Sequence, residues 1–164
     1  MKRSRSEIEN EFINQLPKLN LPEFSYRYQI REEQIYILDE IRKKFILLTP
    51  EEWVRQNFVK YLMNEKKFSP QFIRVEHRIK LDNLTKRCDI IIFDNKLQPY
   101  LIVECKSPDV VINQSTLQQI GIYNIKLKAK YLAVTNGLNH YYFNNDFENK
   151  RIFQIDDIPK NERN

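Results

Sequence analysis

The sequence predicts an α/β protein in which a central mixed β-sheet is flanked by helices. Two near-continuous apolar runs, residues 88–93 and 100–106, are typical of strands that are buried on both faces. The polar stretch at residues 94–99 supplies turn residues, so the two runs are expected to form a hairpin. A helical segment then precedes another apolar run at residues 131–135, which favours a strand–helix–strand crossover and a parallel pair within the sheet.

The chain is expected to divide into three parts. Residues 1–24 hold a basic tail, a short helix that starts with a capping box at residues 6–9, and a linker. Residues 25–155 form the main domain, and residues 156–164 form a polar C-terminal tail that frays. The alternation of apolar and polar residues predicts further strands in the main domain, at residues 25–30, 34–38, 71–80, 140–143 and 151–155. Ile73, Val75 and Ile79 are expected on one face of their strand.

Two helices of the main domain have recognisable starts. The first begins at Thr49 as N-cap with Pro50 after it, and Glu52 is expected to complete a capping box. Glu51 beside it is expected to be a solvated acid that the helix dipole favours. The second helix runs from residue 113 or 115 to about residue 129.

The central hairpin is expected to bring two carboxylates together. Asp89 and Glu104 are equidistant from its centre, so they lie opposite each other. Two neighbouring carboxylates repel, and burying either of them unpaired is unfavourable. Mg²⁺ would resolve this conflict, because it takes oxygen ligands and keeps several waters. Lys106 shares a face with Glu104 and would add a positive charge where phosphoryl charge develops. The alternative interpretation is a structural ion triad at the end of a strand.

These three residues form an Asp-X(14)-Glu-X-Lys pattern that resembles the PD-(D/E)XK nuclease superfamily. More narrowly, residues 48–137 resemble the nuclease domain at the N-terminus of the R subunit of type I restriction enzymes. Cys88 stands where the superfamily name has a proline, a position that varies widely among its members. The resemblance is carried by five segments, at residues 49–56, 87–89, 103–108, 119–124 and 134–137.

The resemblance implies a restriction-endonuclease-like core and a Mg²⁺-dependent endonuclease that hydrolyses phosphodiester bonds in DNA, with Mn²⁺ as a substitute metal. Asp89 and Glu104 would hold the metal, with the backbone carbonyl of Cys105 as a further ligand. Lys106 would activate or orient water. Gln119 and Tyr123, which share a helix face, would support cleavage beside the active site.

Two sets of residues each allow two interpretations. Glu52, with Arg55 three residues later, resembles an additional acidic residue that helps to bind a metal, or it only caps its helix. Lys86 and Arg87 would contact DNA phosphate, or they are ordinary solvated residues at the start of a strand.

Two other functions stay open on the sequence alone. The first alternative is a nucleic-acid-binding or assembly module that keeps the nuclease fold without cutting. The second is an α/β scaffold whose carboxylates only form salt bridges. The intact set of Asp89, Glu104 and Lys106 argues against a decayed site and therefore favours the nuclease.

The composition of the chain indicates what kind of partner it binds and in which compartment it lies. The net charge of +5 is consistent with a polyanionic partner. Cys88 and Cys105 are interpreted as small buried hydrophobes in a reducing compartment. No apolar run reaches the ~18–20 residues that a membrane span needs, and the N-terminus lacks a secretory signal, so we expect a cytoplasmic protein that does not enter a membrane.

The expected partners follow from the same features. DNA is the expected substrate, and the sequence has no phosphate-binding loop of the form G-x-x-x-x-G-K-[ST], so an ATP-driven motor would have to come from a partner. Two protein partners stay open. They are restriction-modification or motor subunits, and a second copy of the chain, because a homodimer would present two active sites to the two strands of a duplex.

Overall fold

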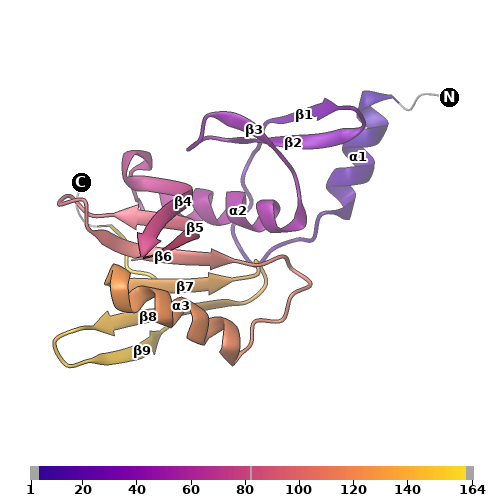
Figure 1. The fold of residues 1–164 in the computed structure, drawn as a ribbon. Coiled ribbons are helices and arrows are strands. Elements are labelled where there is room, and N and C mark those ends of the chain that lie inside the picture. Colours follow the sequence, from indigo (N-terminus) through magenta and orange to yellow (C-terminus); the bar gives the residue numbers. More distant parts are fainter. Residues whose placement is uncertain (1–3, 82, 162–164) are drawn as a thin grey trace.

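A computed structural model describes residues 4–81 and 83–161 and contains two β-sheets (Figure 1). A small antiparallel sheet has the order β1-β2-β3, and a large mixed sheet has the order β4-β5-β6-β7-β8-β9. The predicted α/β class and the mixed central sheet are therefore confirmed. In chain order the elements are α1 (Arg5–Gln15), β1 (Tyr28–Arg31), β2 (Gln34–Asp39), β3 (Lys44–Leu47), α2 (Pro50–Asn64), the 3-10 turn η1 (Pro70–Phe72), β4 (Ile73–Leu81), β5 (Leu84–Phe93), β6 (Pro99–Cys105), α3 (Gln114–Leu127), β7 (Tyr131–Thr135), β8 (His140–Asp146) and β9 (Arg151–Ile155).

The large sheet has the connections that the sequence predicts. β5 and β6 form an antiparallel hairpin in which Ile90 pairs with Val103 and Ile92 pairs with Leu101. Extending that register by one residue brings Asp89 opposite Glu104. β6 continues through α3 into β7, and β6 and β7 are parallel, which confirms the predicted crossover.

The two helices of the main domain cover opposite faces of the large sheet. On one face α2 contributes Phe58 and Leu62 to a core with Ile90 and Val103. On the other face Ile120 of α3 packs in a second cluster with three sheet residues, Ile91, Ile102 and Leu132. Neighbouring residues of β5 and β6 thus enter different cores, which explains why both strands are continuous apolar runs.

The small sheet has its own core and was only partly predicted. Ile35, Ile37 and Leu48 are buried there, and α1 packs against them through Ile8 and Phe12. Strand β3 was not predicted, because it has only four residues, directly follows a charged turn, and has a pattern too short to stand out. Figure 1 shows α2 between this small sheet and the large sheet.

The start of α1 differs from the prediction. Ser4, rather than Ser6, is the N-cap, and it forms a capping box with Glu7. Both serines have a glutamate three residues later, so the sequence offers two equivalent frames.

The face pattern of β4 also differs from the prediction. Ile73 and Val75 pack in the cluster on the α2 side, whereas Ile79 packs in the cluster on the α3 side. Between them Glu76 has a φ of 50°, in the left-handed region. A residue in this conformation interrupts the regular alternation of side chains along a strand. The side chains after Glu76 therefore lie on the opposite face of the sheet from the one that the alternation predicts.

The C-terminal segment is polar but packs against the domain as far as residue 161. Ile158 is fully buried in the core on the α2 side. The side chain of Asp157 accepts a hydrogen bond from the Tyr61 hydroxyl at 2.7 Å, and the backbone N–H of Asn161 donates to the Lys66 carbonyl at 2.7 Å. The prediction that this segment frays is therefore wrong up to residue 161, because one apolar residue anchors it.

Gly137 and Gly121 provide a matched test of the backbone conformation and the local space at two positions. Gly137 has a φ of 83°, and a Cβ there would lie 2.6 Å from Cδ2 of Leu19. A Cβ on Gly121, inside α3, would meet nothing within 4 Å. We expect Gly137→Ala to lower the free energy of unfolding by about 1–2 kcal/mol, and Gly121→Ala to raise it by about 0.5–1 kcal/mol. Urea unfolding of both variants measures this, and equal effects would contradict the assigned backbone conformations.

Candidate active site

Asp89 and Glu104 lie side by side where β5 and β6 meet. The Asp89 side chain reaches across to the neighbouring strand, and its Oδ2 accepts a hydrogen bond of 2.7 Å from the backbone N–H of Cys105. Asp89 is buried, with only 8% of the residue exposed. The carboxylate is thereby held in one position between the two strands.

The second oxygen of Asp89 is bound by a helix. Nη2 of Arg55, on α2, donates to Asp89 Oδ1 at 2.9 Å, and Nη1 of the same guanidinium pairs with Glu52. Burial alone would lower the pKa of Arg55, but the charges of Glu52 and Asp89 outweigh it and raise that pKa. Arg55 is therefore a permanent cation that links α2 to the candidate site.

Glu104 is neutralised differently, by a residue of its own strand. Lys106 Nζ donates to Glu104 Oε1 at 2.7 Å, and the two side chains are 30% and 29% exposed. Burial raises the pKa of Glu104, and the negative charge of Asp89 raises it further, against the opposing effect of Lys106. The Asp89 carboxylate is thus close enough to disfavour the ionisation of Glu104, as the hairpin register predicts.

Lys106 is a cation in this arrangement. Burial would lower its pKa, but the hydrogen bond and charge of Glu104 outweigh burial and raise it. A lysine with a raised pKa is a poor proton acceptor at neutral pH. Its suitable roles are therefore to orient water and to stabilise negative charge.

Helix α3 closes the other side of the site. A pocket of about 190 Å³ is lined by Glu104, Gln119 and Tyr123, together with Lys86, Arg87, Thr116 and Ile120. The structure therefore brings the predicted helical pair to the same pocket as Glu104. The Tyr123 hydroxyl accepts a hydrogen bond of 3.0 Å from Lys86 Nζ, and that ammonium lies 4.7 Å from the centre of the Tyr123 ring.

Glu52 is buried in an ion network. Its Oε1 accepts hydrogen bonds of 2.8 Å from Arg42 and from Gln56, and its Oε2 pairs with Arg55. Thr49 does accept from the Glu52 backbone N–H, but the Glu52 side chain is occupied elsewhere, so the predicted capping box is wrong. Metal binding by Glu52 stays a prediction that would require these ion pairs to open.

Glu51, the neighbouring acid, interacts with the site more than the sequence predicts. Its side chain is 45% exposed and pairs with Arg55 at 2.9 Å. Its negative charge contributes to the raised pKa of both Glu104 and Lys106. The expectation of a purely solvated first-turn acid is therefore incomplete. The sequence signal was weak, because Glu51 and Glu52 are adjacent and only the fold decides which one faces the hairpin.

The donor set suits a hard cation that brings its own waters. Among residues 4–81 and 83–161, no group of three or more His, Cys, Asp or Glu side chains is arranged as a metal site. Two mutually repelling carboxylate oxygen donors nevertheless fit Mg²⁺, which needs one or two protein carboxylates beside water and phosphate. The Cys105 thiol is buried in the apolar core, and burial raises its pKa well above the usual range, so only the backbone carbonyl of Cys105 remains as a candidate ligand.

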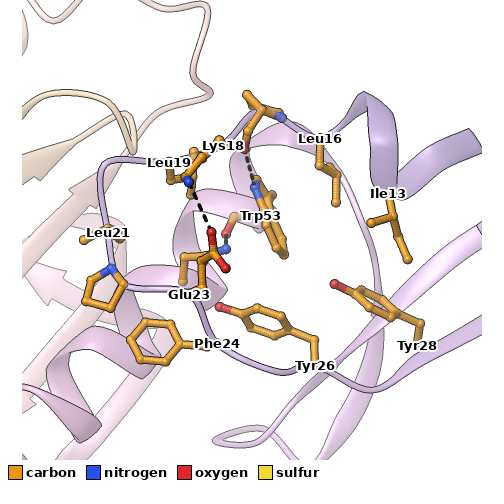
Figure 2. Close-up of a pocket in the computed structure, with 13 residues that line it drawn as sticks. Ile13, Leu16, Lys18, Leu19, Leu21, Glu23, Phe24, Tyr26, Tyr28 and Trp53 are labelled. Carbon is orange, nitrogen blue, oxygen red and sulfur yellow. Dashed lines mark hydrogen bonds and ion pairs between the residues drawn. The ribbon is translucent and has the colours of Figure 1, made fainter. Parts of the chain in front are cut away.

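A separate cavity of about 420 Å³ lies between the linker after α1 and helix α2 (Figure 2). Tyr26 and Trp53 form one wall, with ring centres 5.1 Å apart. Trp53 Nε1 donates to the Pro17 carbonyl at 3.1 Å, which fixes the linker against α2. None of the predicted site residues lines this cavity.

Comparison with known proteins identifies the family. The sequence pattern of the family described as "Type I restriction enzyme R protein N terminus" matches residues 50–159. Because this match covers well over half of the chain, the protein belongs to the family of type I restriction enzyme R protein N-terminal domains. No curated protein sequence matches the chain.

One similar solved structure is described as "The fragment structure of a putative HsdR subunit of a type I restriction enzyme from Vibrio vulnificus YJ016". It is 20% identical, with a TM-score of 0.48, and the match covers 69% of this chain and 24% of that one. The match therefore spans about a quarter of the length of that solved chain. None of the helices within residues 4–81 and 83–161 has the length and apolar character for crossing a membrane.

We expect the raised pKa of Glu104 to appear in the stability of the protein. A carboxyl with a raised folded-state pKa contributes stability that is present below its unfolded-state pKa and is lost as the pH rises through the folded-state value. Glu104→Gln, which cannot ionise, should therefore melt at a higher temperature than wild type in EDTA at neutral pH. The difference should vanish below the unfolded-state pKa of about 4.3.

Magnesium provides the complementary measurement. A ligand at 100 times its dissociation constant stabilises a folded protein by about 2.7 kcal/mol. Adding Mg²⁺ should therefore raise the melting temperature of wild type and have less effect on Glu104→Gln. Equal shifts in both proteins would mean that Glu104 does not bind the metal.

Proposed function

We propose that the protein is a Mg²⁺-dependent endonuclease with a restriction-endonuclease-like core, and that it hydrolyses phosphodiester bonds in DNA. The observation that carries the proposal is the side-by-side pair of Asp89 and Glu104, with Lys106 bound to Glu104 and a pocket opening onto α3. Membership of the restriction-enzyme family supports it.

The residues would divide the work as follows. Asp89 and Glu104 would hold Mg²⁺, with the Cys105 carbonyl as a further ligand, and Mn²⁺ would substitute. When bound, the metal would polarise a phosphoryl oxygen and acidify water. Lys106 would orient the attacking water and stabilise the negative charge that develops on the phosphoryl group. Gln119, exposed on the pocket wall, would position substrate or water.

The role of Tyr123 would be to position Lys86. Its hydroxyl and its ring both contact the Lys86 ammonium, and this ammonium lines the same pocket as Glu104. A cation held there would contact a phosphate next to the cleaved bond. Tyr123 would therefore support cleavage without touching the reacting atoms.

A non-cleaving nucleic-acid-binding or assembly module is the second candidate. The observation that favours it is that both oxygens of Asp89 already have protein partners, Arg55 and the Cys105 N–H. A metal would have to share Asp89 with these donors. Calorimetric titration with Mg²⁺ separates the two candidates, because a module without a metal site would give no heat of binding.

Membership of the family supports the substrate and partners that we propose. DNA is the proposed substrate, and we propose a cytoplasmic protein. Restriction-modification or motor subunits are proposed partners, because the chain belongs to a family of type I restriction enzyme R protein domains. A homodimer is the alternative assembly, since it would present one active site to each strand.

Lys106→Ala tests the proposed activity directly. We expect wild type to cut plasmid or single-stranded DNA in the presence of Mg²⁺ or Mn²⁺, and the variant to be slower by about 10²–10³-fold, because a preorganised charge at the reacting group is lost. Lys96→Ala is the matched control, since Lys96 is exposed in the turn at the other end of the hairpin. No metal-dependent cutting by wild type, together with no bound metal, would exclude the nuclease for this chain.

Tyr123→Phe tests the proposed positioning of Lys86. The variant keeps the ring and removes the hydroxyl that accepts from Lys86. A hydrogen bond to a charged group contributes about 1.5–3 kcal/mol, so we expect cleavage to slow by about tenfold or more. If Tyr123 acts through Lys86, the losses in cleavage rate should not add. The double variant should then cleave no more slowly than Lys86→Ala alone. Additive losses would mean that the two residues act independently.

A further inference from the structure

The hairpin of β4 and β5 carries an excess of positive charge beside the candidate active site. Within residues 77–81 and 83–88, four side chains are cationic and none is acidic; Asp82, at the tip, lies outside the described residues. The four cations are Arg78, Lys80, Lys86 and Arg87. Such a concentration on one projecting hairpin needs a physical reason.

Two of these cations face each other directly. Arg78 is the cross-strand partner of Arg87 in the register of β4 and β5, and Lys80 is opposite Thr85, further along the same face. Like charges in directly opposite positions destabilise a strand pair. Among the described residues, neither Arg78 nor Lys80 forms an ion pair, and Arg87 has only a contact of 3.6 Å with Glu76. Folding alone therefore does not account for this pair.

Glu76 is not free to neutralise the hairpin. Its Oε2 pairs with Arg42 at 3.2 Å, and its Oε1 lies 3.5 Å from Arg55. One carboxylate thus serves three arginines. Arg87 remains 60% exposed, so most of its charge is directed to solvent.

The hairpin continues directly from the carboxylates. Arg87 is two residues before Asp89 on β5, and Lys80 pairs with the residue four positions before Asp89. Four residues of a strand cover about 13 Å. A DNA backbone lying along the hairpin could therefore bring more than one phosphate within reach of these cations.

We propose that Arg78, Lys80 and Arg87 form a phosphate-binding arm that holds the DNA backbone next to the cleaved bond. The inference rests on the proposed nuclease function and adds where the substrate lies. A phosphate between Arg78 and Arg87 would convert their repulsion into a shared attraction. Contacts of this type give affinity and register without base recognition.

The test compares the double variant Arg78→Ala/Lys80→Ala with the matched control Lys96→Ala. Binding of a labelled DNA duplex is followed by fluorescence anisotropy in EDTA, at salt concentrations from 50 to 200 mM. The slope of log affinity against log salt should become shallower by about 1.8 in the double variant, for two lost phosphate contacts. Across this fourfold range the affinity of wild type should fall about tenfold more than that of the variant. Lys96→Ala should retain the wild-type slope.

The melting temperature at low salt distinguishes a phosphate-binding role of Arg78 from a structural role. Removing one member of a repelling pair should leave the melting temperature of Arg78→Ala unchanged or higher, whereas a stabilising role would lower it.

The outcomes separate the arm from the nuclease. A double variant with the slope of Lys96→Ala, or a wild type that does not bind duplex DNA in EDTA, would overturn the arm. A shallower slope in the double variant supports the arm even if wild type fails to cut with Mg²⁺, and that failure would count against the nuclease alone.

Discussion

The buried guanidinium of Arg55 is the interaction on which the rest of the site depends. It joins Glu52 of its own helix to Asp89 of β5, and Glu52 in turn binds Arg42, which lies in the turn between β2 and β3 of the small sheet. Removing one partner from a buried ion pair leaves an uncompensated charge, which typically destabilises a protein by about 3–5 kcal/mol. This network therefore fixes the relative positions of the small sheet, α2 and the large sheet together.

A consequence is that the two carboxylates of the site differ in freedom. Asp89 is held by α2 and by the next strand, with both oxygens engaged. Among the residues that the structure describes, the Glu104 side chain is bound only by Lys106, and both of these side chains are partly exposed. A bound cation or phosphate can therefore exchange partners with Glu104 and Lys106 more easily than with Asp89. The site therefore combines Asp89, a preorganised carboxylate, with Glu104 and Lys106, which can change partners.

The sequence predicts this site better than its surroundings. The hairpin register could be predicted because a two-residue slip is incompatible with the turn at 94–99, and the register alone brings Asp89 to Glu104. The position of Gln119 and Tyr123 followed from helical spacing. The roles of Glu51 and Glu52 could not be predicted, since both are first-turn acids and the choice depends on Arg42, a distant partner. β3 was missed because a four-residue strand carries too little pattern, and the sequence alone does not reveal that it pairs with β2 in a second sheet.

The left-handed conformation at Glu76 explains which face of β4 carries the arm. The ladder pairs Val75 with Ile90 and His77 with Cys88, but has no pair at the intervening position, where Glu76 faces Asp89. Unbroken alternation after Val75 would direct Arg78 and Lys80 toward α3. The face reversal instead directs them toward the side of α2, where Glu76 binds Arg42 and approaches Arg55. A strained backbone conformation persists only where its surroundings hold it, and here three arginines hold the carboxylate.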